Sequence, residues 1–353
     1  MRQMKKSEKT VTSKEGYGLA VYLLFTGIML LTGILCVCVG SVNVPVSDTL
    51  KIIGNAILRR PAAPGAASSI ILSVRLPRVL CVALTGAALS VCGGAMQGLL
   101  KNPLADGSTL GVSSGASLGA AVAIAFEIRL PFLPFSATMA MAMLFAFLSL
   151  VAILSLAYRL DCSLSTNTII LIGIIFSMFI SSILSLVITF AGDHVKSITF
   201  WTMGSLAGSS YGNALVLLAA LILCAGIIIW HARELNDFAI GEDNARHIGV
   251  NVQRVRLVVL ITVSVLIGVC VSIGGSIGFV GLVTPHIVRM LTGPNHKRLL
   301  PGTVFAGATF LMLADLAARV ILRPLELPIG VVTSFIGAIL FVYIYYQSRT
   351  VSR

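Results

Sequence analysis

The sequence consists mainly of long apolar runs, and the longest uncharged stretch sets the strongest limit on how the chain can fold. Residues 257–288 contain no Asp, Glu, Lys or Arg. As one helix this stretch would extend about 48 Å, whereas the hydrocarbon core of a bilayer is about 30 Å thick. Glycines that permit a break cluster within it at Gly274, Gly275, Gly278 and Gly281. The stretch therefore predicts two membrane segments joined by a turn.

Composition indicates that a bilayer surrounds most of the chain. Of its 353 residues, 57% are hydrophobic and 11% are charged, whereas soluble domains carry about 25% charged residues. A spanning helix takes about 20 apolar residues. Ten spans are predicted near residues 17–40, 79–100, 108–128, 132–158, 168–191, 211–231, 256–274, 278–292, 301–322 and 328–347. We expect an all-α polytopic membrane protein with about ten transmembrane helices, forming one transmembrane domain over residues 17–348 after a basic segment, residues 1–16.

The distribution of basic residues predicts the orientation in the membrane. The net charge of +12 is scattered over loop ends, which favours a positive-inside bias over nucleic-acid binding. With ten spans and a cytoplasmic N-terminus, 16 of the 25 Lys and Arg residues lie inside and nine outside. Both termini are then cytoplasmic. Arg75 and Arg78 fall on the outer side, against the general trend.

Small residues recur at every fourth position in two places. The stripes are Gly86, Ser90, Gly94 and Gly98, and Gly111, Gly115 and Gly119. Such stripes let helices approach closely in lipid. In addition, SVCGGAMQGLLKNPL (90–104) and VSIGGSIGFVGLVTPHI (271–287) each place a Gly-Gly pair before a proline. In the expected topology they start in opposite directions, which favours an inverted internal repeat of the kind common in transporters.

The sequence lacks the motifs of several enzyme classes. It contains no GxxxxGK[ST] phosphate loop and no HExxH, and its seven cysteines form no CxxC pair. We therefore expect no catalytic residue, no metal site and no cofactor. Asp315 lies within an apolar run, four residues before Arg319. This spacing favours a structural ion pair, and a proton relay is the alternative.

The segment HARELNDFAIGEDNARHIGVNVQRVR (231–256) is the longest hydrophilic stretch inside the chain. It mixes both charge signs, and GEDNARHIGV predicts a short helix ending near Gly249. In the expected topology the segment is cytoplasmic. A membrane chain without its own ATP site but with such a segment is expected to dock a partner there.

Four stretches carry a resemblance to a known family. They are RLPRVLCVALTGAALSVCGGAMQGLLKNPLADGSTLGVSSGASLG (75–119), IGEDNARHIGVNV (240–252), GSIGFVGLVTPHIVR (275–289) and ELPIGVVTSFIGAILF (326–341). In this order they resemble the FecCD (BtuC-like) permease family, the membrane subunits of ABC importers for ferric siderophores, haem and vitamin B12. The resemblance covers about residues 17–348 and implies a location in the cytoplasmic (inner) membrane of a bacterium.

The resemblance implies the type II ABC importer permease fold and a set of partners. These are two ATPase subunits that hydrolyse the ATP, a second permease subunit, identical or paralogous, and an extracytoplasmic substrate-binding protein. It also implies that Arg75, Arg78 and Arg319 bind acidic residues of the binding protein. For Arg75 and Arg78, anchoring to lipid headgroups is the alternative role.

The resemblance also implies two sets of residues on the cytoplasmic side. The ATPase-coupling residues are Gly241, Glu242, Asn244, Ala245, Arg246, Gly249 and Val250. The cytoplasmic gate is formed by Asn102, Leu104, Thr166 and Asn167, although the family often has a small hydroxyl residue where Asn167 stands.

The expected function is the permease subunit of an ATP-driven importer of an iron chelate, a ferric siderophore. Import of cobalamin or haem by the same mechanism is the first alternative, because the motifs do not separate these cargoes. A proton-coupled secondary transporter, with Asp315 as the titrating group, is the alternative from a different class. The sequence offers no nucleophile–base pair that would support an intramembrane enzyme.

Overall fold

The computed structural model describes residues 19–58, 65–130, 136–162 and 164–351, which are helical apart from short turns and loops. The predicted basic segment 1–16 lies outside the described residues. The first half contains α1 (Leu19–Cys38), α2 (Val46–Ile57), α3 (Ala66–Ser69), the π-helical η2 (Ile70–Arg75), α4 (Leu76–Leu99), η3 (Gly107–Leu110), α5 (Val112–Ala125), α6 (Ala137–Leu160) and α7 (Thr166–Phe190). The second half contains η4 (Gly192–His194), α8 (Val195–Thr202), α9 (Tyr211–Trp230), α10 (Ala232–Ile240), α11 (Glu242–His247), α12 (Val252–Gly274), α13 (Val280–Thr292), α14 (His296–Val320) and α15 (Ile329–Val351).

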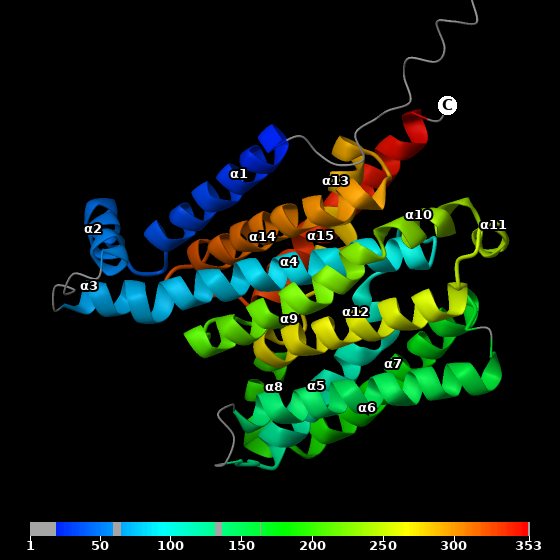
Figure 1. The fold of residues 1–353 in the computed structure, drawn as a ribbon. Helices are drawn as coiled ribbons and strands as arrows, with labels where there is room; N and C mark the ends of the chain where they lie inside the picture. Colours follow the sequence, from blue (N-terminus) through cyan, green and yellow to red (C-terminus); the bar gives the residue numbers. More distant parts are fainter. Residues whose placement is uncertain (1–18, 59–64, 131–135, 163, 352–353) are drawn as a thin grey trace, which may run out of the picture.

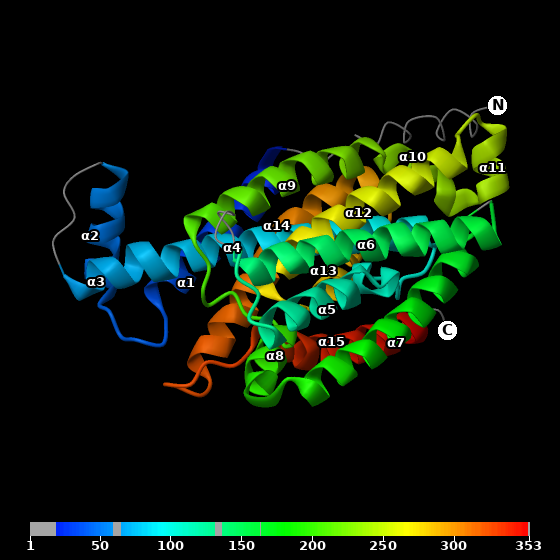
Figure 2. The ribbon, with the colours of Figure 1, turned by 90° about the horizontal axis from the view of Figure 1, so that it is seen from below.

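The long helices lie roughly side by side and form a bundle with two distinct ends (Figures 1 and 2). One end carries α2 and α3 and is called the arginine end, because Arg75, Arg78 and Arg319 lie there. The other end carries α10 and α11 and is called the α11 end. Helix α1 begins and helix α15 ends at the α11 end (Figure 1). The described ends of the chain therefore lie at the same end of the bundle.

The predicted fold class is confirmed. Within the described residues, seven helices are long and apolar enough to cross a membrane: α1, the continuous helix Ala66–Leu99, α6, α7, α9, α12 and α14. Shorter apolar helices lie at Val112–Ala125 and Ile329–Val342, and α13 completes the set. These ten helices correspond to the ten spans predicted from the sequence.

The predicted break in the long uncharged stretch is also confirmed. Helix α12 ends at Gly274 and α13 begins at Val280. Gly275 has a φ of +69°, a conformation that glycine adopts without strain. The Gly274 carbonyl accepts a hydrogen bond of 2.8 Å from the Ser205 amide. This pairing fits the rule that non-helical backbone at membrane depth is buried in protein.

Three parts of the chain differ from the expectation. The predicted span 79–100 begins too late, because the helix runs without a break from Ala66 to Leu99. Arg75 and Arg78 therefore lie within the helix instead of before it. Helices α2 and α8 were not predicted, since both are short and lie outside the apolar runs. Helix α10 was read as part of a hydrophilic segment, but it buries Leu235 and Phe238 on one face.

The small-residue stripes lie at helix–helix contacts. A Cβ at Gly86 would collide with the Gly307 carbonyl of α14, and one at Gly119 would collide with the Met141 carbonyl of α6. Ser90 accepts a 2.6 Å hydrogen bond from Thr284 of α13. The stripes thus have the packing role expected of small residues in lipid-embedded helices.

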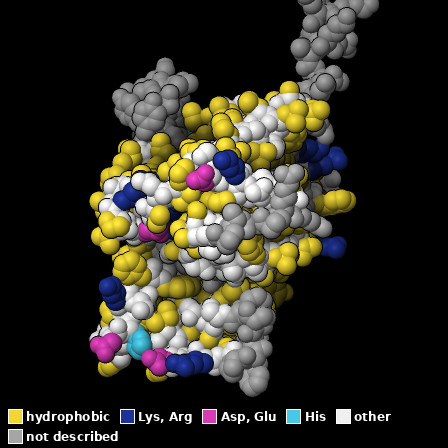
Figure 3. Space-filling model, turned by 90° about the vertical axis from the view of Figure 1, so that its left-hand side faces the viewer, with side chains coloured by type: hydrophobic (Ala, Val, Ile, Leu, Met, Phe, Trp, Pro, Cys, Tyr) yellow, Lys and Arg dark blue, Asp and Glu magenta, His cyan; other side chains and the backbone are white. Residues whose placement is uncertain are grey.

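Burial is highest in the middle of the bundle, and its outward side chains are mainly apolar. Helices α4 and α12 are mostly buried, whereas most residues of α1, α6, α7 and α9 are half-buried or exposed. Their exposed residues include Leu31, Phe179 and Leu223. Viewed onto the arginine end, the molecule shows few charged side chains scattered among hydrophobic ones (Figure 3). The exposed apolar side chains along α1, α7 and α9 suit a bilayer as the solvent.

Candidate functional sites at the two ends of the bundle

Three predicted docking arginines lie inside the bundle instead of on its surface. Arg75, Arg78 and Arg319 are 5%, 6% and 2% exposed. Together with Asp315 and Glu326 they form the arginine cluster. The sequence did not predict this burial, and the docking role of the three arginines stays a prediction. The physical reason for the burial is that acids on α14 and on the loop after it neutralise guanidinium groups that would otherwise be buried without a counter-charge.

Asp315 is the centre of the arginine cluster. Its carboxylate lies 2.9 Å from Nη2 of Arg78 and 2.9 Å from Nε of Arg319. The second contact is the i,i+4 pair of α14 expected from the sequence. Arg319 also donates to the Cys36 carbonyl at 3.1 Å. Asp315 is 1% exposed, so two charges on different helices depend on one buried carboxylate.

Arg78 has a second acidic partner, Glu326, which the sequence reasoning missed. Nη1 of Arg78 lies 2.6 Å from the Glu326 carboxylate, and the Glu326 side chain is 31% exposed. Partial burial opposes ionisation of Glu326, but the hydrogen bond and charge of Arg78 prevail and hold the pKa of this carboxyl below its ordinary value. The sequence signal was the acid in ELPIG (326–330), directly before the last span.

Arg75 is held by backbone carbonyls instead of carboxylates. Its Nη1 donates to the carbonyls of Val37 and Cys38 at 2.9 and 3.1 Å, and its Nη2 donates to the carbonyl of Val42. These carbonyls belong to the end of α1 and the turn after it. Arg75 thus fixes α1 against the start of the Ala66–Leu99 helix.

The predicted coupling residues form a short helix that protrudes at the α11 end (Figure 1). Gly241 and Gly249 bracket it with φ values of +130° and +91°, a region that favours glycine. Ala245 is fully buried and anchors the helix, and its carbonyl accepts from the Val250 amide at 3.0 Å. Asn244 closes the preceding helix by donating to the Ile240 carbonyl at 3.1 Å.

The outer side of α11 combines charged and apolar groups. Arg246 is exposed, and Ile240 and Ile248 are 71% and 66% exposed. A hollow with a volume of about 410 Å³ lies beside the helix. It is lined by Arg233, Glu234, Asp237, Ile248, Gly249, Val250, Asn251 and Val255. Exposed isoleucines beside a polar hollow are suited to contact with another protein.

The predicted gate residues lie at the α11 end. Asn102 and Leu104 lie in the loop after α4, and Thr166 and Asn167 lie in the first turn of α7. The Asn102 side chain accepts a hydrogen bond from the Leu104 amide at 2.9 Å, and Leu104 is 50% exposed. Thr166 is the first residue of α7, followed by the exposed Asn167. The structure therefore places both pairs at the end that carries α11.

The sequence reasoning missed two polar residues that contact each other, the buried Gln97 and the half-buried Arg289. Nε2 of Gln97 donates to the carbonyls of Gly281 and Leu282 at 3.3 and 3.2 Å. Its Oε1 accepts from Nη2 of Arg289 at 3.0 Å. The signal was a single amide side chain within an otherwise apolar run, which in a membrane requires partners.

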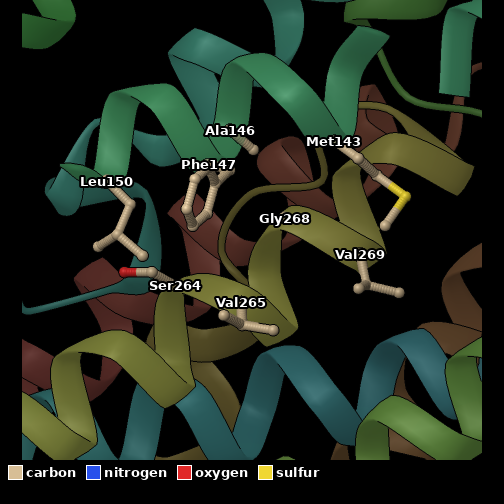
Figure 4. Close-up of a pocket in the computed structure, with 8 residues that line it drawn as sticks. All are labelled: Met143, Ala146, Phe147, Leu150, Ser264, Val265, Gly268 and Val269. Atoms are coloured by element: carbon tan, nitrogen blue, oxygen red, sulfur yellow. The ribbon is translucent and has the colours of Figure 1, made fainter. Parts of the chain in front are cut away.

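A lateral crevice lies between α6 and α12 (Figure 4). Its volume is about 160 Å³, and its walls are Met143, Ala146, Phe147, Leu150, Ser264, Val265, Gly268 and Val269. Small-molecule sites usually measure about 300–1,000 Å³, so this crevice is too small for a bulky cargo. Within the described part of the chain, no group of three or more His, Cys, Asp or Glu side chains is arranged to hold a metal ion.

An all-helical membrane bundle with a protruding short helix at one end is the architecture of an ABC importer permease, and comparison with known proteins identifies the family. The FecCD transport family matches residues 28–347. The chain therefore belongs to the FecCD family. Permeases of this family work with separate ATPase subunits and a second permease, so the chain is a transport subunit and not itself an enzyme. Membership also decides against the proton-coupled alternative.

Individual relatives match over most of their length. The ABC transporter permease protein YvrB of Bacillus subtilis is 40% identical over 91% of this chain and 90% of its own. The hemin transport permease HmuU of Yersinia pestis is 38% identical over 79% of this chain and 83% of its own. A solved metal-chelate type ABC transporter in an inward-facing conformation matches with a TM-score of 0.81 and 32% identity, over 93% of this chain and 99% of that one.

Other relatives carry names for different cargoes. The cobalamin import permease BtuC of Halobacterium salinarum is 34% identical over 80% of this chain and 74% of its own. The molybdate import permease MolB of Haemophilus influenzae is 37% identical over 79% of this chain and 82% of its own. Relatives of similar identity therefore differ in what they carry.

Proposed function

We propose that this chain translocates an iron chelate, a ferric siderophore, that a substrate-binding protein delivers. The observation that carries the proposal is α7, which starts at the gate residue Thr166 and contains no charged residue over its 25 residues. Its hydroxyls are satisfied locally; for example, Ser177 donates to the Gly173 carbonyl at 2.7 Å. A path along such a helix at the interface of two permease subunits suits a bulky complex whose iron is already coordinated, because the path need not supply ligands.

Uptake by whole cells tests the cargo. Cells with and without the permease are offered radio-iron siderophores, haem, labelled cobalamin and molybdate. The proposal expects permease-dependent accumulation of a ferric siderophore that stops when the ATPase is disabled. Accumulation of cobalamin or haem alone would select the alternative cargoes and reject the siderophore.

The binding protein is proposed to dock at the arginine cluster through acidic side chains. The cluster holds three guanidinium groups and two carboxylates, which leaves an excess of one positive charge. Nη2 of Arg319 is buried without a hydrogen-bond partner among the described residues. Charged donors of this kind favour a carboxylate partner, and complementary charge also speeds and orients docking.

Binding of the purified binding protein to the permease–ATPase complex in nanodiscs tests this docking site. Arg78→Gln is expected to weaken binding by about ten-fold or more, the effect of losing a charged partner at an interface. Arg129→Gln is the matched control, since Arg129 is an exposed arginine near the same end. Equal affinities for folded wild type and Arg78→Gln would reject the docking role and leave Arg78 as a structural residue paired with Asp315 and Glu326.

The α11 end is proposed to face the cytoplasm and to dock the ATPase through α11. Ile248→Asp should reduce copurification of the ATPase with a tagged permease, because it places a charge on an exposed apolar contact. Phe126→Asp is the control, since Phe126 is 72% exposed and lies just after α5. Equal copurification of both variants would exclude Ile248 from the interface.

Native cysteines offer a test of orientation. Cys162 is exposed near the α11 end, and the other six cysteines are buried. A membrane-impermeant maleimide should therefore label Cys162 in inside-out vesicles and not in intact cells or spheroplasts. Asp193→Cys places a thiol on an exposed residue after α7, at the arginine end, and should show the reverse. Labelling of Cys162 from the outside would reverse the proposed topology.

A further inference from the structure

Arg256 is a buried charge at the α11 end that none of the roles above uses. It is the fifth residue of α12 and is 1% exposed. A guanidinium in such a place needs fixed partners, because burying a charge is costly unless it is paired and hydrogen-bonded. Its partners lie on two different elements, and each element carries residues proposed to act in transport.

The first partner lies on the proposed coupling helix. Nη2 of Arg256 is 2.5 Å from Oε1 of Glu242, the first residue of α11. The Glu242 side chain is 28% exposed, so the arginine is desolvated while the carboxylate still reaches solvent. Separating this pair would leave the buried charge of Arg256 without a counter-charge, which is energetically costly. The two side chains are therefore expected to stay in contact when α11 moves.

The second partner lies on the turn that leads into the proposed gate helix. Nη1 of Arg256 donates to the Leu164 carbonyl at 2.6 Å. Leu164 is fully buried and has a φ of +52°, a conformation that side-chain-bearing residues rarely adopt. One residue later in this turn comes Ser165, followed by Thr166 and Asn167 of α7.

The turn is itself tied to α7 and to α12. Oδ2 of Asp161 accepts from the Ser165 amide at 3.0 Å and from Oγ1 of Thr168 at 3.1 Å. Gln253 of α12 donates to the Cys162 carbonyl at 2.8 Å. These hydrogen bonds join the loop between α6 and α7 to the first residues of α7. A shift of the Leu164 carbonyl is therefore transmitted to the start of α7 instead of being absorbed by a loose loop.

We propose that Arg256 is a positioning residue that makes α11 and the start of α7 move together. A displacement of α11 by the ATPase would then reach Thr166 and Asn167 through Glu242, Arg256 and Leu164. This inference rests on the proposed coupling function of α11 and the proposed gate. Arginine suits the role because its planar group donates in two directions at once, whereas a lysine ammonium cannot hold the same two partners in fixed geometry.

The experiment uses the complete transporter, with ATPase subunits and binding protein, in proteoliposomes. ATP hydrolysis and cargo uptake are measured together, and uptake per ATP is the readout. Arg256→Met and Glu242→Gln are each expected to lower uptake per ATP about ten-fold, within the usual range of coupling between sites. Arg256→Lys should fall between Arg256→Met and wild type. Arg254→Met is the matched control, because Arg254 is an exposed arginine two residues away and should leave the ratio unchanged.

The outcomes separate the link from the function on which it rests. An unchanged uptake per ATP in Arg256→Met, or uptake and hydrolysis falling in proportion, would overturn the link and leave Arg256 a residue that only stabilises the fold. If Arg256→Met does not fold, Glu242→Gln decides, because its side chain is partly exposed. Absence of ATP-driven uptake by the wild-type transporter would instead overturn the proposed function.

Discussion

Replacing Asp315 by Asn tests whether the arginine cluster is a structural ion network. The side chain is 1% exposed and lies 2.9 Å from both Arg78 and Arg319. Asn keeps the size of the side chain but removes its charge. Arg78 would keep Glu326 as a counter-charge, whereas Arg319 would be left with backbone carbonyls alone. The substitution therefore leaves one buried guanidinium without a carboxylate.

The expected loss of stability follows from that uncompensated charge. Removing one partner of a buried ion pair costs about 3–5 kcal/mol. Arg319→Met should cost less, about 1–3 kcal/mol, because Asp315 remains paired with Arg78 and the loss is mainly that of hydrogen bonds to a charged group. The prediction that Asp315→Asn destabilises the protein more than Arg319→Met is thus a stricter test than either free-energy value alone.

Thermal unfolding of the purified permease in detergent, followed by size-exclusion chromatography, measures both effects. Asp193→Asn is the control, because Asp193 is exposed. We expect Asp315→Asn to lower the midpoint most, Arg319→Met less, and Asp193→Asn not measurably. A midpoint for Asp315→Asn equal to that of wild type would refute the reasoning, since it would mean that Arg319 does not need a counter-charge.

Two further predictions concern helix packing and pH. Gly93→Ala should destabilise the fold by about 1–3 kcal/mol or more, because a Cβ at Gly93 would collide with the Gly281 backbone; Gly226→Ala, where nothing lies within 4 Å, should be close to neutral in the same melting assay. The pKa of Glu326 is held below its ordinary value, so its stabilising contribution is present above the unfolded pKa of about 4.3 and is lost as the pH falls through the lower folded value. Melting curves should show a smaller acid dependence for Glu326→Gln than for wild type, and identical curves would contradict the pairing with Arg78.

The sequence was sufficient to predict the number and approximate limits of the membrane helices. Apolar runs carry this information directly, because the bilayer fixes the length of a span. The break after Gly274 was also predictable, since the uncharged stretch is too long for one crossing. Helix α2 was not predictable in this way, because its 12 residues mix polar and apolar side chains and contain no long apolar run.

Burial of the arginines could not be read from the sequence. Arg78 and Asp315 are 237 residues apart, and only the packing of α4 against α14 brings them together. Charge patterning suggests which side of the membrane an arginine faces, but it does not say whether a neighbouring helix supplies a carboxylate. For the same reason Arg256 was counted as a cytoplasmic loop charge, although Glu242 and the Leu164 carbonyl hold it inside the protein.

The two buried-arginine sites differ in charge balance, and the difference matches their proposed roles. At the arginine cluster Arg78 and Arg319 pair with two carboxylates, whereas Arg75 has only backbone carbonyls as partners. One more carboxylate from outside can therefore be accommodated without an excess of negative charge. At the α11 end, Arg256 pairs one-to-one with Glu242, and its second donor is taken by a backbone carbonyl. An arginine whose charge is already balanced gains little from an external acid, which suits a fixed internal link. The unbalanced cluster at the opposite end retains a reason to attract one.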